Sequence, residues 1–237
     1  PSGSSDPYAL RRNLNGIIQI IWQENFDIKF DKLIARLLKY WDSEINNFKI
    51  NNLKLLDELV EFSRLRIISH LEDLAYGKDI ILSTCESENI KHLNILDLAD
   101  LKNRVELIHK LKIGNNSWNL INIITRYAKL ANKGNLEKNI YALREYLDVE
   151  LFEKESEINV YKFLQLSEKL INNKNWEYTQ LINLFEENMQ YLIDIFDTNV
   201  GVMIMCEDLK IRKNRLNLLA LVRNYSLLIA DFTLLNS

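Results

Sequence analysis

The chain has 237 residues, of which 47% are hydrophobic and 27% are charged. These proportions are typical of a globular protein and exclude a disordered or membrane-embedded chain. Only six glycines and two prolines occur. Because turns in sheet-rich folds use both residues and helix interiors exclude them, this scarcity predicts an almost entirely helical protein. The net charge of −3 excludes a global field that attracts nucleic acid or an anionic membrane, so any such binding must be local.

The cysteines and the apolar runs indicate the compartment. Cys85 and Cys206 stand far apart and lack C-x-x-C spacing, so they indicate neither a disulfide framework nor a zinc site. No stretch reaches the roughly 20 apolar residues of a membrane span, and no secretory signal opens the chain. We therefore expect an intracellular protein, cytoplasmic or nuclear. Residues 1–7 read as a linker or an added remnant, and 8–237 as a single helical domain with its best internal boundary near 78–89.

Amphipathic helices are predicted throughout the first half of the chain. Apolar residues recur at helical spacing from Leu14 to Trp22, from Phe30 to Trp41 with continuation to Phe48, and from Leu55 to Leu74. The third helix carries apolar residues over more than half its circumference, so we expect it to be buried on more than one side. A further helix is expected from Ile90 to Leu111, with Asp97 and Asp100 as points where it could break.

Two helix-turn-helix units follow one another between Ser117 and Phe196. Their Asn-rich turns begin at Asn132 and Asn172, 40 positions apart, which is in the range of helical-hairpin repeats. The second helix of the first unit is predicted from Leu136 to Leu147. The fold class expected from this pattern is all-α, an irregular, α-solenoid-like stack of antiparallel helical hairpins. A compact multi-helix bundle is the alternative architecture.

The last part of the chain holds a short apolar run and a strongly patterned helix. Val200 to Cys206 could form a strand or a buried helical turn, and the helical surroundings favour the turn. From Leu218 to Phe232 the apolar residues keep one continuous helical face. At 100° per residue, Arg212, Arg215 and Arg223 fall together roughly opposite that face.

Motifs that carry chemistry are absent from the sequence. Glu106 and His109 form one E-x-x-H pair, whereas helical di-iron sites use two such motifs with further carboxylates, so we predict no metal site. The glycines do not form a phosphate-binding loop, and no nucleophile elbow occurs. The sequence therefore indicates neither a cofactor nor a small-molecule substrate, and it predicts a protein that is not an enzyme.

One local charge feature and one aromatic residue are the candidate partner-binding residues. Basic side chains cluster at the start of the last helix, where they form either a solvated face, the favoured interpretation, or a contact strip for an acidic partner. The acidic connector 148–157 and the carboxylates near Asp194 and Asp197 are the candidate ion-pair partners of the solvated face. Trp176 lies in a polar turn, where it either folds back onto its own hairpin, again the favoured interpretation, or marks a contact site. The full set of candidates is Lys210, Arg212, Lys213, Arg215, Arg223 and Trp176.

These observations favour a non-catalytic scaffold or adaptor domain that binds protein partners in a larger intracellular assembly. A nucleic-acid-binding helical module that uses the basic stripe of the last helix is one alternative. It is less favoured, because aromatic residues do not interleave with the basic ones as they do in single-strand-binding proteins. A helical regulator or exchange factor acting on a partner protein is the other alternative.

Overall fold

The computed structural model describes residues 8–44, 52–90, 93–114 and 117–235. About 71% of the described residues are helical, and they contain no strand, only an isolated bridge between Lys29 and Asp97. The predicted all-α class is confirmed. The expected linker 1–7 and the continuation of the second helix through residues 45–48 lie outside the described residues.

Eleven α-helices and four short 3₁₀ or π segments follow one another in the described residues. The first six helices are α1 (Leu10–Gln23), α2 (Phe30–Glu44), α3 (Asn52–Asp73), α4 (Lys78–Ile81), α5 (Leu98–Ile113) and α6 (Ser117–Ala131). The others are α7 (Leu143–Tyr146), α8 (Glu155–Ile171), α9 (Tyr178–Glu187), α10 (Met189–Asp194) and α11 (Leu209–Ser226). The short segments are the π-helix η1 (Leu82–Glu86) and the 3₁₀ helices η2 (Glu88–Ile90), η3 (Val149–Leu151) and η4 (Phe232–Leu234).

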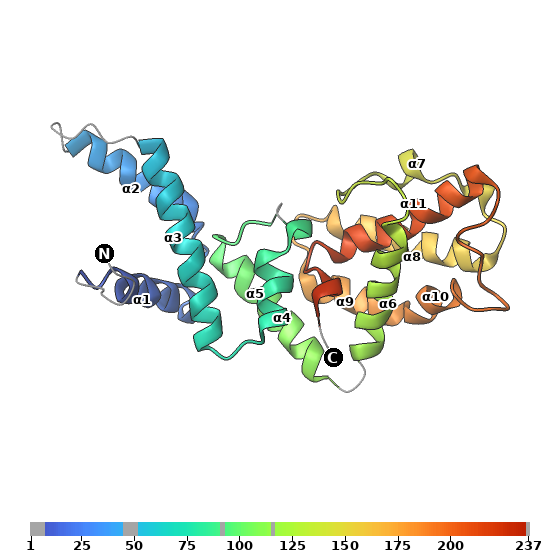
Figure 1. The fold of residues 1–237 in the computed structure, drawn as a ribbon, viewed down its shortest axis with the longest axis horizontal. Coiled ribbons are helices and arrows are strands. Elements are labelled where there is room, and N and C mark those ends of the chain that lie inside the picture. The colour runs from blue at the N-terminus through green and yellow to red at the C-terminus, as the bar shows by residue number, and fades with distance from the viewer. Residues whose placement is uncertain (1–7, 45–51, 91–92, 115–116, 236–237) are drawn as a thin grey trace.

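The helices form two parts, an arm and a body (Figure 1). The arm consists of α1 to α3, residues 10–73, and projects away from the remaining helices. The body consists of α5 to η4, residues 98–234. Residues 78–90, which form α4, η1 and η2, connect the two parts.

The arm holds to the body through α1 and the beginning of α5. The indole N–H of Trp22 donates to the carbonyl of Leu98 at 2.9 Å, and the Lys102 ammonium donates to the carbonyl of Trp22 at 2.7 Å. α5 begins only at Leu98, because the Asp97 side chain accepts from the backbone N–H of Asp100 and caps the helix there. The helix expected from Ile90 is therefore shorter at its start, and Asp97 is the break that the sequence marked.

α3 differs from its expected burial. Its buried side chains are confined to the second half of the helix, at Ser63, Ile67, His70 and Leu71. Among the side chains described, the first half is at most half-buried. α3 packs against α1, α2 and α4, as burial on more than one side requires, but its first half, which lies beside α2 at the far end of the arm (Figure 1), is not fully buried as expected.

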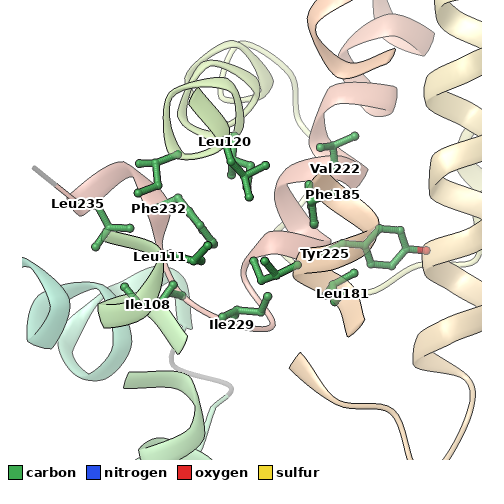
Figure 2. Close-up of a cluster of buried hydrophobic side chains, with 14 of the residues drawn as sticks. Ile108, Leu111, Leu120, Leu181, Phe185, Val222, Tyr225, Ile229, Phe232 and Leu235 are labelled. Carbon is green, nitrogen blue, oxygen red and sulfur yellow. The ribbon is translucent and has the colours of Figure 1, made fainter. Parts of the chain in front are cut away.

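α11 is the central helix of the body and packs most extensively on α6. Every side chain from Asn214 to Ser226 is buried. Figure 2 shows how the end of this helix fills the core. Phe232 lies against Ile108 and Leu111 of α5, and Tyr225 lies beside Phe185 of α9.

The connecting segment is tied to the body by polar groups. Asp231 accepts from the Ser87 hydroxyl at 2.6 Å and from the Asn89 amide at 2.6 Å. Arg104 of α5 is fully buried and donates to the carbonyl of Thr84 in the π-helix at 2.8 Å. Asp100, one turn earlier on α5, accepts from the same guanidinium at 2.8 Å. These bonds fix the π-helix against the body.

Only one of the two predicted hairpins forms in full. α8, α9 and α10 reproduce the second unit, whereas residues 132–142 of the first unit form no helix and α7 spans four residues. The carbonyls of Leu136, Glu137 and Asn139 accept hydrogen bonds from side chains of α11 in place of a helical ladder. The helix expected from Leu136 to Leu147 is therefore wrong, and the solenoid-like stacking remains a prediction.

Residues 200–206 form a turn-rich loop rather than a helix. The chain folds back on itself here, with the N–H of Gly201 donating to Asp197 and that of Val202 donating to Ile195. A Cβ atom at Gly201 would lie 2.4 Å from the carbonyl oxygen of Asp197, so only glycine fits this return. The helical interpretation of the apolar run is wrong for this reason.

Candidate functional site

A groove of about 1060 Å³ lies between the first half of α11 and the irregular segment 133–151. We call it the α11 groove. It brings together three of the predicted partner-binding residues, Lys210, Arg212 and Lys213. Residues far away in sequence form the facing wall, among them the basic Lys133 and Arg144.

The start of α11 fixes the basic residues of the groove. The Asp208 carboxylate accepts from the backbone N–H groups of Lys210 at 2.8 Å and Ile211 at 3.0 Å, and these bonds hold the pKa of Asp208 below its ordinary value. Arg212 donates to the carbonyl of Cys206 at 2.6 Å, so part of its hydrogen-bonding capacity is used by the preceding loop. Lys210 and Lys213 remain exposed to solvent.

Asparagine side chains of α11 join the two walls of the groove. Asn214 donates its amide to the carbonyl of Asp148 and accepts from the Asp148 N–H, both at 2.9 Å. Asn217, one turn later, donates to the carbonyl of Tyr146 at 2.9 Å. Because these bonds satisfy an irregular backbone that lacks a helical partner, the groove is formed before any ligand arrives.

Further along α11, side chains also form hydrogen bonds with the backbone of the rest of the irregular segment. Arg223 donates to the carbonyl of Leu136 at 2.8 Å, and Asn224 donates to the carbonyl of Glu137 at 2.8 Å. Burial lowers the pKa of Arg223, which is 3% exposed. The expectation that Arg223 belongs to a solvated face is wrong, because this face of α11 lies under the segment.

Arg215 is also buried, and it binds the acidic connector. Its guanidinium donates to Glu157 at 2.9 Å, to Glu153 at 2.6 Å and to the carbonyl of Met203 at 3.2 Å. Burial alone would lower the pKa of Arg215, but the bonds to Glu157 and Glu153 outweigh it and raise the pKa. The pairing with the acidic connector is therefore observed, whereas the solvated position is not.

Trp176 lies outside the α11 groove. It lines a separate hollow of about 510 Å³ between α5 and the start of α9. Its half-buried ring meets the ring of Tyr178 edge-on, with centroids 5.0 Å apart. The hydroxyl of Tyr178 donates to Asp100, and burial raises the pKa of Tyr178. The structure does not bring Trp176 together with the basic residues.

The α11 groove is positively charged although the chain as a whole is negative. Five cationic and three anionic side chains line it, which leaves two positive charges, against −3 for the chain. In the part of the chain that the structure describes, Lys133, Arg144, Lys210 and Lys213 form no ion pair. Their charges are therefore available to an anionic ligand.

An aromatic ring accompanies these cations. Tyr146 lines the groove, and its ring packs on that of Tyr141 with centroids 4.5 Å apart. The sequence places no aromatic residue among the basic ones of α11, but the fold supplies one from the facing wall. Cations that meet phosphate oxygens and a ring that can stack are the features with which proteins hold single-stranded nucleic acid.

Sequence reasoning missed Lys133, Arg144 and Tyr146 as groove residues. The signal that could have found them lies on α11, where Asn214, Asn217 and Asn224 share one helical face. Asparagine is uncommon on a buried helical face unless it bonds to nearby backbone. Three in this register indicate an irregular segment lying across the helix.

Two further properties concern metals and membranes. The described residues contain no group of three or more His, Cys, Asp or Glu side chains placed to hold a metal ion. None of the helices in the described ranges combines the length and the apolar character needed to cross a bilayer.

Comparison with known proteins identifies similar chains. The sequence model of a family described as glycyl-tRNA synthetase beta subunit matches residues 1–86. The chain is 30% identical to the glycine-tRNA ligase beta subunit of Trichodesmium erythraeum, over 98% of this chain and 32% of that protein. For the beta subunit of Acaryochloris marina the identity is 28%, over 98% of this chain and 33% of that protein. For that of Natranaerobius thermophilus it is 29%, over 99% and 32%.

The chain therefore spans about one third of the length of these relatives. The relatives are named as subunits, in agreement with the predicted subunit of a complex. The predicted intracellular location is also that of these bacterial ligases, which are cytoplasmic.

Two expectations from the sequence are wrong. The chain was expected to be a non-catalytic scaffold or adaptor, and not an enzyme. The proteins that it resembles along nearly its whole length are instead named as subunits of a ligase that acts on tRNA. The absence of catalytic motifs led to the wrong prediction because it concerns only an active site within this stretch. The relatives extend over about three times its length.

Proposed function

We propose that this chain is part of the beta subunit of a glycine-tRNA ligase and that its α11 groove binds tRNA. The observation that carries the proposal is the similarity to glycine-tRNA ligase beta subunits along 98% of the chain. The groove supports it independently, because a positive, preformed surface on a negative chain selects a polyanion.

The groove residues have separate roles in this proposal. Lys210 and Lys213 meet phosphates as flexible point charges, and Arg144 adds a planar fork that suits phosphate oxygens. Tyr146 offers a face on which an unpaired base stacks. Asn214 and Asn217 act on the ligand only indirectly, since they hold the wall that carries Tyr146.

The name of the relatives also implies a protein partner. A subunit designated beta assembles with at least one other kind of chain, and we propose such a partner for this protein as well. The chain then shares in an enzymatic reaction by holding the tRNA while the complete ligase joins glycine to it.

The test is a charge reversal in the groove, Lys210→Glu with Lys213→Glu. We expect the tRNA affinity of the ligase to fall at least about tenfold and the slope of log K against log salt to shrink by about two. The matched control is Lys162→Glu with Lys169→Glu, which makes the same charge change on exposed residues of α8 outside the groove. Filter binding across a salt series measures both quantities.

Equal tRNA binding by the groove variant and the parent would refute the groove as the site. Equal losses in the groove and control variants would show that only the overall charge matters. Both variants change exposed side chains, so their unfolding free energies should stay within about 0.5 kcal/mol of the parent.

A further inference from the structure

At the far end of the arm, α2 and α3 pack together without fully burying any apolar side chain, and several of these side chains are exposed. We define the arm tip as residues 35–42 of α2 and 54–62 of α3. No side chain in these two ranges is fully buried. Leu37 is 50% exposed and Trp41 56%. These two residues lie four positions apart, so they share one face of α2.

The arm tip lacks a core of its own. Leu56, Leu59 and Phe62 of α3 are partly buried, and α2 is the neighbouring helix at this end of the arm. Two helices that pack together bury only the faces that meet. Because the apolar stripe of a helix is wider than one such contact, part of the stripe remains uncovered. Among the described residues, the face with Leu37 and Trp41 therefore stays open to solvent. Large exposed apolar patches mark interaction sites.

We propose that the arm tip docks onto the part of the beta subunit polypeptide outside these 237 residues. This inference rests on the proposed function. The relatives are about three times as long as the stretch shared with this chain, so about two thirds of such a subunit is available as the occupant. The match to the family model covers residues 1–86, which include the whole arm. An interface between parts of one chain also explains why the arm projects away from the remaining helices (Figure 1).

The charges of the arm tip favour a protein surface over RNA. Its two ranges contain three basic residues and four acidic ones, a net charge of −1. One of the basic residues, Lys54, already lies 3.7 Å from Glu58. A surface with no positive excess gains little from phosphates, whereas an aromatic ring beside a leucine is typical of the apolar centre of a protein interface.

Site-specific photocrosslinking tests the proposal in a beta subunit that contains these 237 residues. Benzoylphenylalanine replaces Leu37 in one variant and Leu166 of α8 in the matched control. The two leucines are alike in exposure, at 50% and 48%. We expect the Leu37 variant to crosslink to a peptide of the same beta chain outside these 237 residues, as identified by mass spectrometry. The Leu166 variant should not yield that peptide.

The other outcomes overturn the proposal and identify the actual occupant. A crosslink between two beta chains would mean that a second copy covers the tip, and a crosslink to tRNA would make it an RNA contact. A crosslink to another kind of subunit, or none above the Leu166 control, would also refute it. The groove variants Lys210→Glu and Lys213→Glu should leave the crosslink unchanged, so this test can fail or succeed separately from the proposed tRNA site.

Discussion

The arm tip and α11 both carry side chains in surroundings that do not match their polarity: apolar side chains in solvent at the arm tip and polar side chains in the core at α11. α11 carries polar residues such as Asn214, Asn217 and Asn224 on a helix that is buried almost all round. α2 carries Leu37 and Trp41 on a helix that is open to solvent at its far half. In α11 every one of these polar groups meets backbone of the irregular segment, so the mismatch is resolved within the chain. In the arm tip the described residues offer no such resolution.

The difference indicates which part of the molecule is complete by itself. The body hydrogen-bonds the asparagines of α11 to its own backbone. Its core contains residues from every helix between α5 and α11 and from the C-terminal end, some of which Figure 2 shows. Its groove is then a surface that can bind without refolding. The arm is bonded to the rest of the protein at its near end, through Trp22 and Lys102 at α5 and through the Phe30 N–H, which donates to the carbonyl of Leu96 at 2.9 Å. We therefore expect substitutions to affect stability strongly in the body and weakly at the arm tip.

The largest effect is expected for Arg215→Ala. This substitution leaves Glu157, which is fully buried, without its cationic partner. Removing one member of a buried ion pair costs about 3–5 kcal/mol, which corresponds to a fall in Tm of roughly 6–20 °C for a domain of this size. Thermal unfolding followed by circular dichroism measures the change.

A double variant shows whether the pairing itself causes the loss. Arg215→Met with Glu157→Gln removes both charges but keeps an acceptor for the N–H of Lys154, which Glu157 bonds at 3.1 Å. We expect the double variant to be more stable than Arg215→Met alone. If the two variants unfold at the same temperature, the shape of the arginine stem matters here and its charge does not.

An intermediate effect is expected for Asn214→Ala, which tests the wall of the groove. The N–H and carbonyl of Asp148 both lose their partner, and leaving such groups unsatisfied costs about 1–3 kcal/mol. The tRNA affinity should fall as well, although no charge changes, because the wall with Tyr146 loosens. The control is Asn119→Ala on the exposed face of α6, which should change neither quantity. An Asn214→Ala variant that loses stability but binds tRNA normally would limit Asn214 to a structural role.

Local patterns predicted what local physics determines. The helices α1, α2, α8 and α11 follow from their apolar spacing, and Asp97 is visible in the sequence as a break. Segment 132–142 is not predictable in this way, because its apolar residues keep helical spacing while its carbonyls bond to side chains about 85 residues away. Long-range hydrogen bonds of this kind override local propensity.

The candidate site was predictable only in part for the same reason. Lys210, Arg212 and Lys213 belong to one sequence cluster and lie together in the groove. Arg215 and Arg223 belong to the same cluster, but the elements that cover them come from elsewhere in the chain. A helical wheel gives the direction in which a side chain points and not what is packed there. The surroundings of Trp176 were the hardest to predict, because an uncharged side chain has no ion-pair partner that the sequence could indicate.

The smallest effect is expected from pH, and it concerns the arm. His70 of α3 is 9% exposed, and its ring lies 5.4 Å from that of Trp22. Burial lowers the pKa of His70 below 6.5, and the nearby Asp73 opposes this only in part. The unfolded chain therefore binds a proton at this residue more readily than the folded chain. Stability is at its full value above pH 6.5 and decreases as the pH falls through that value.

Urea unfolding at pH 7.5 and pH 5.5, followed by tryptophan fluorescence, measures this loss, and His70→Gln should reduce it because glutamine does not titrate. His109→Gln, on α5 in the body, controls for the loss of an imidazole as such. If His109→Gln removed the pH dependence and His70→Gln did not, the acid-sensitive group would lie in the body. The contact between His70 and Trp22 would then contribute to the stability of the arm through packing alone and would not cause its pH dependence.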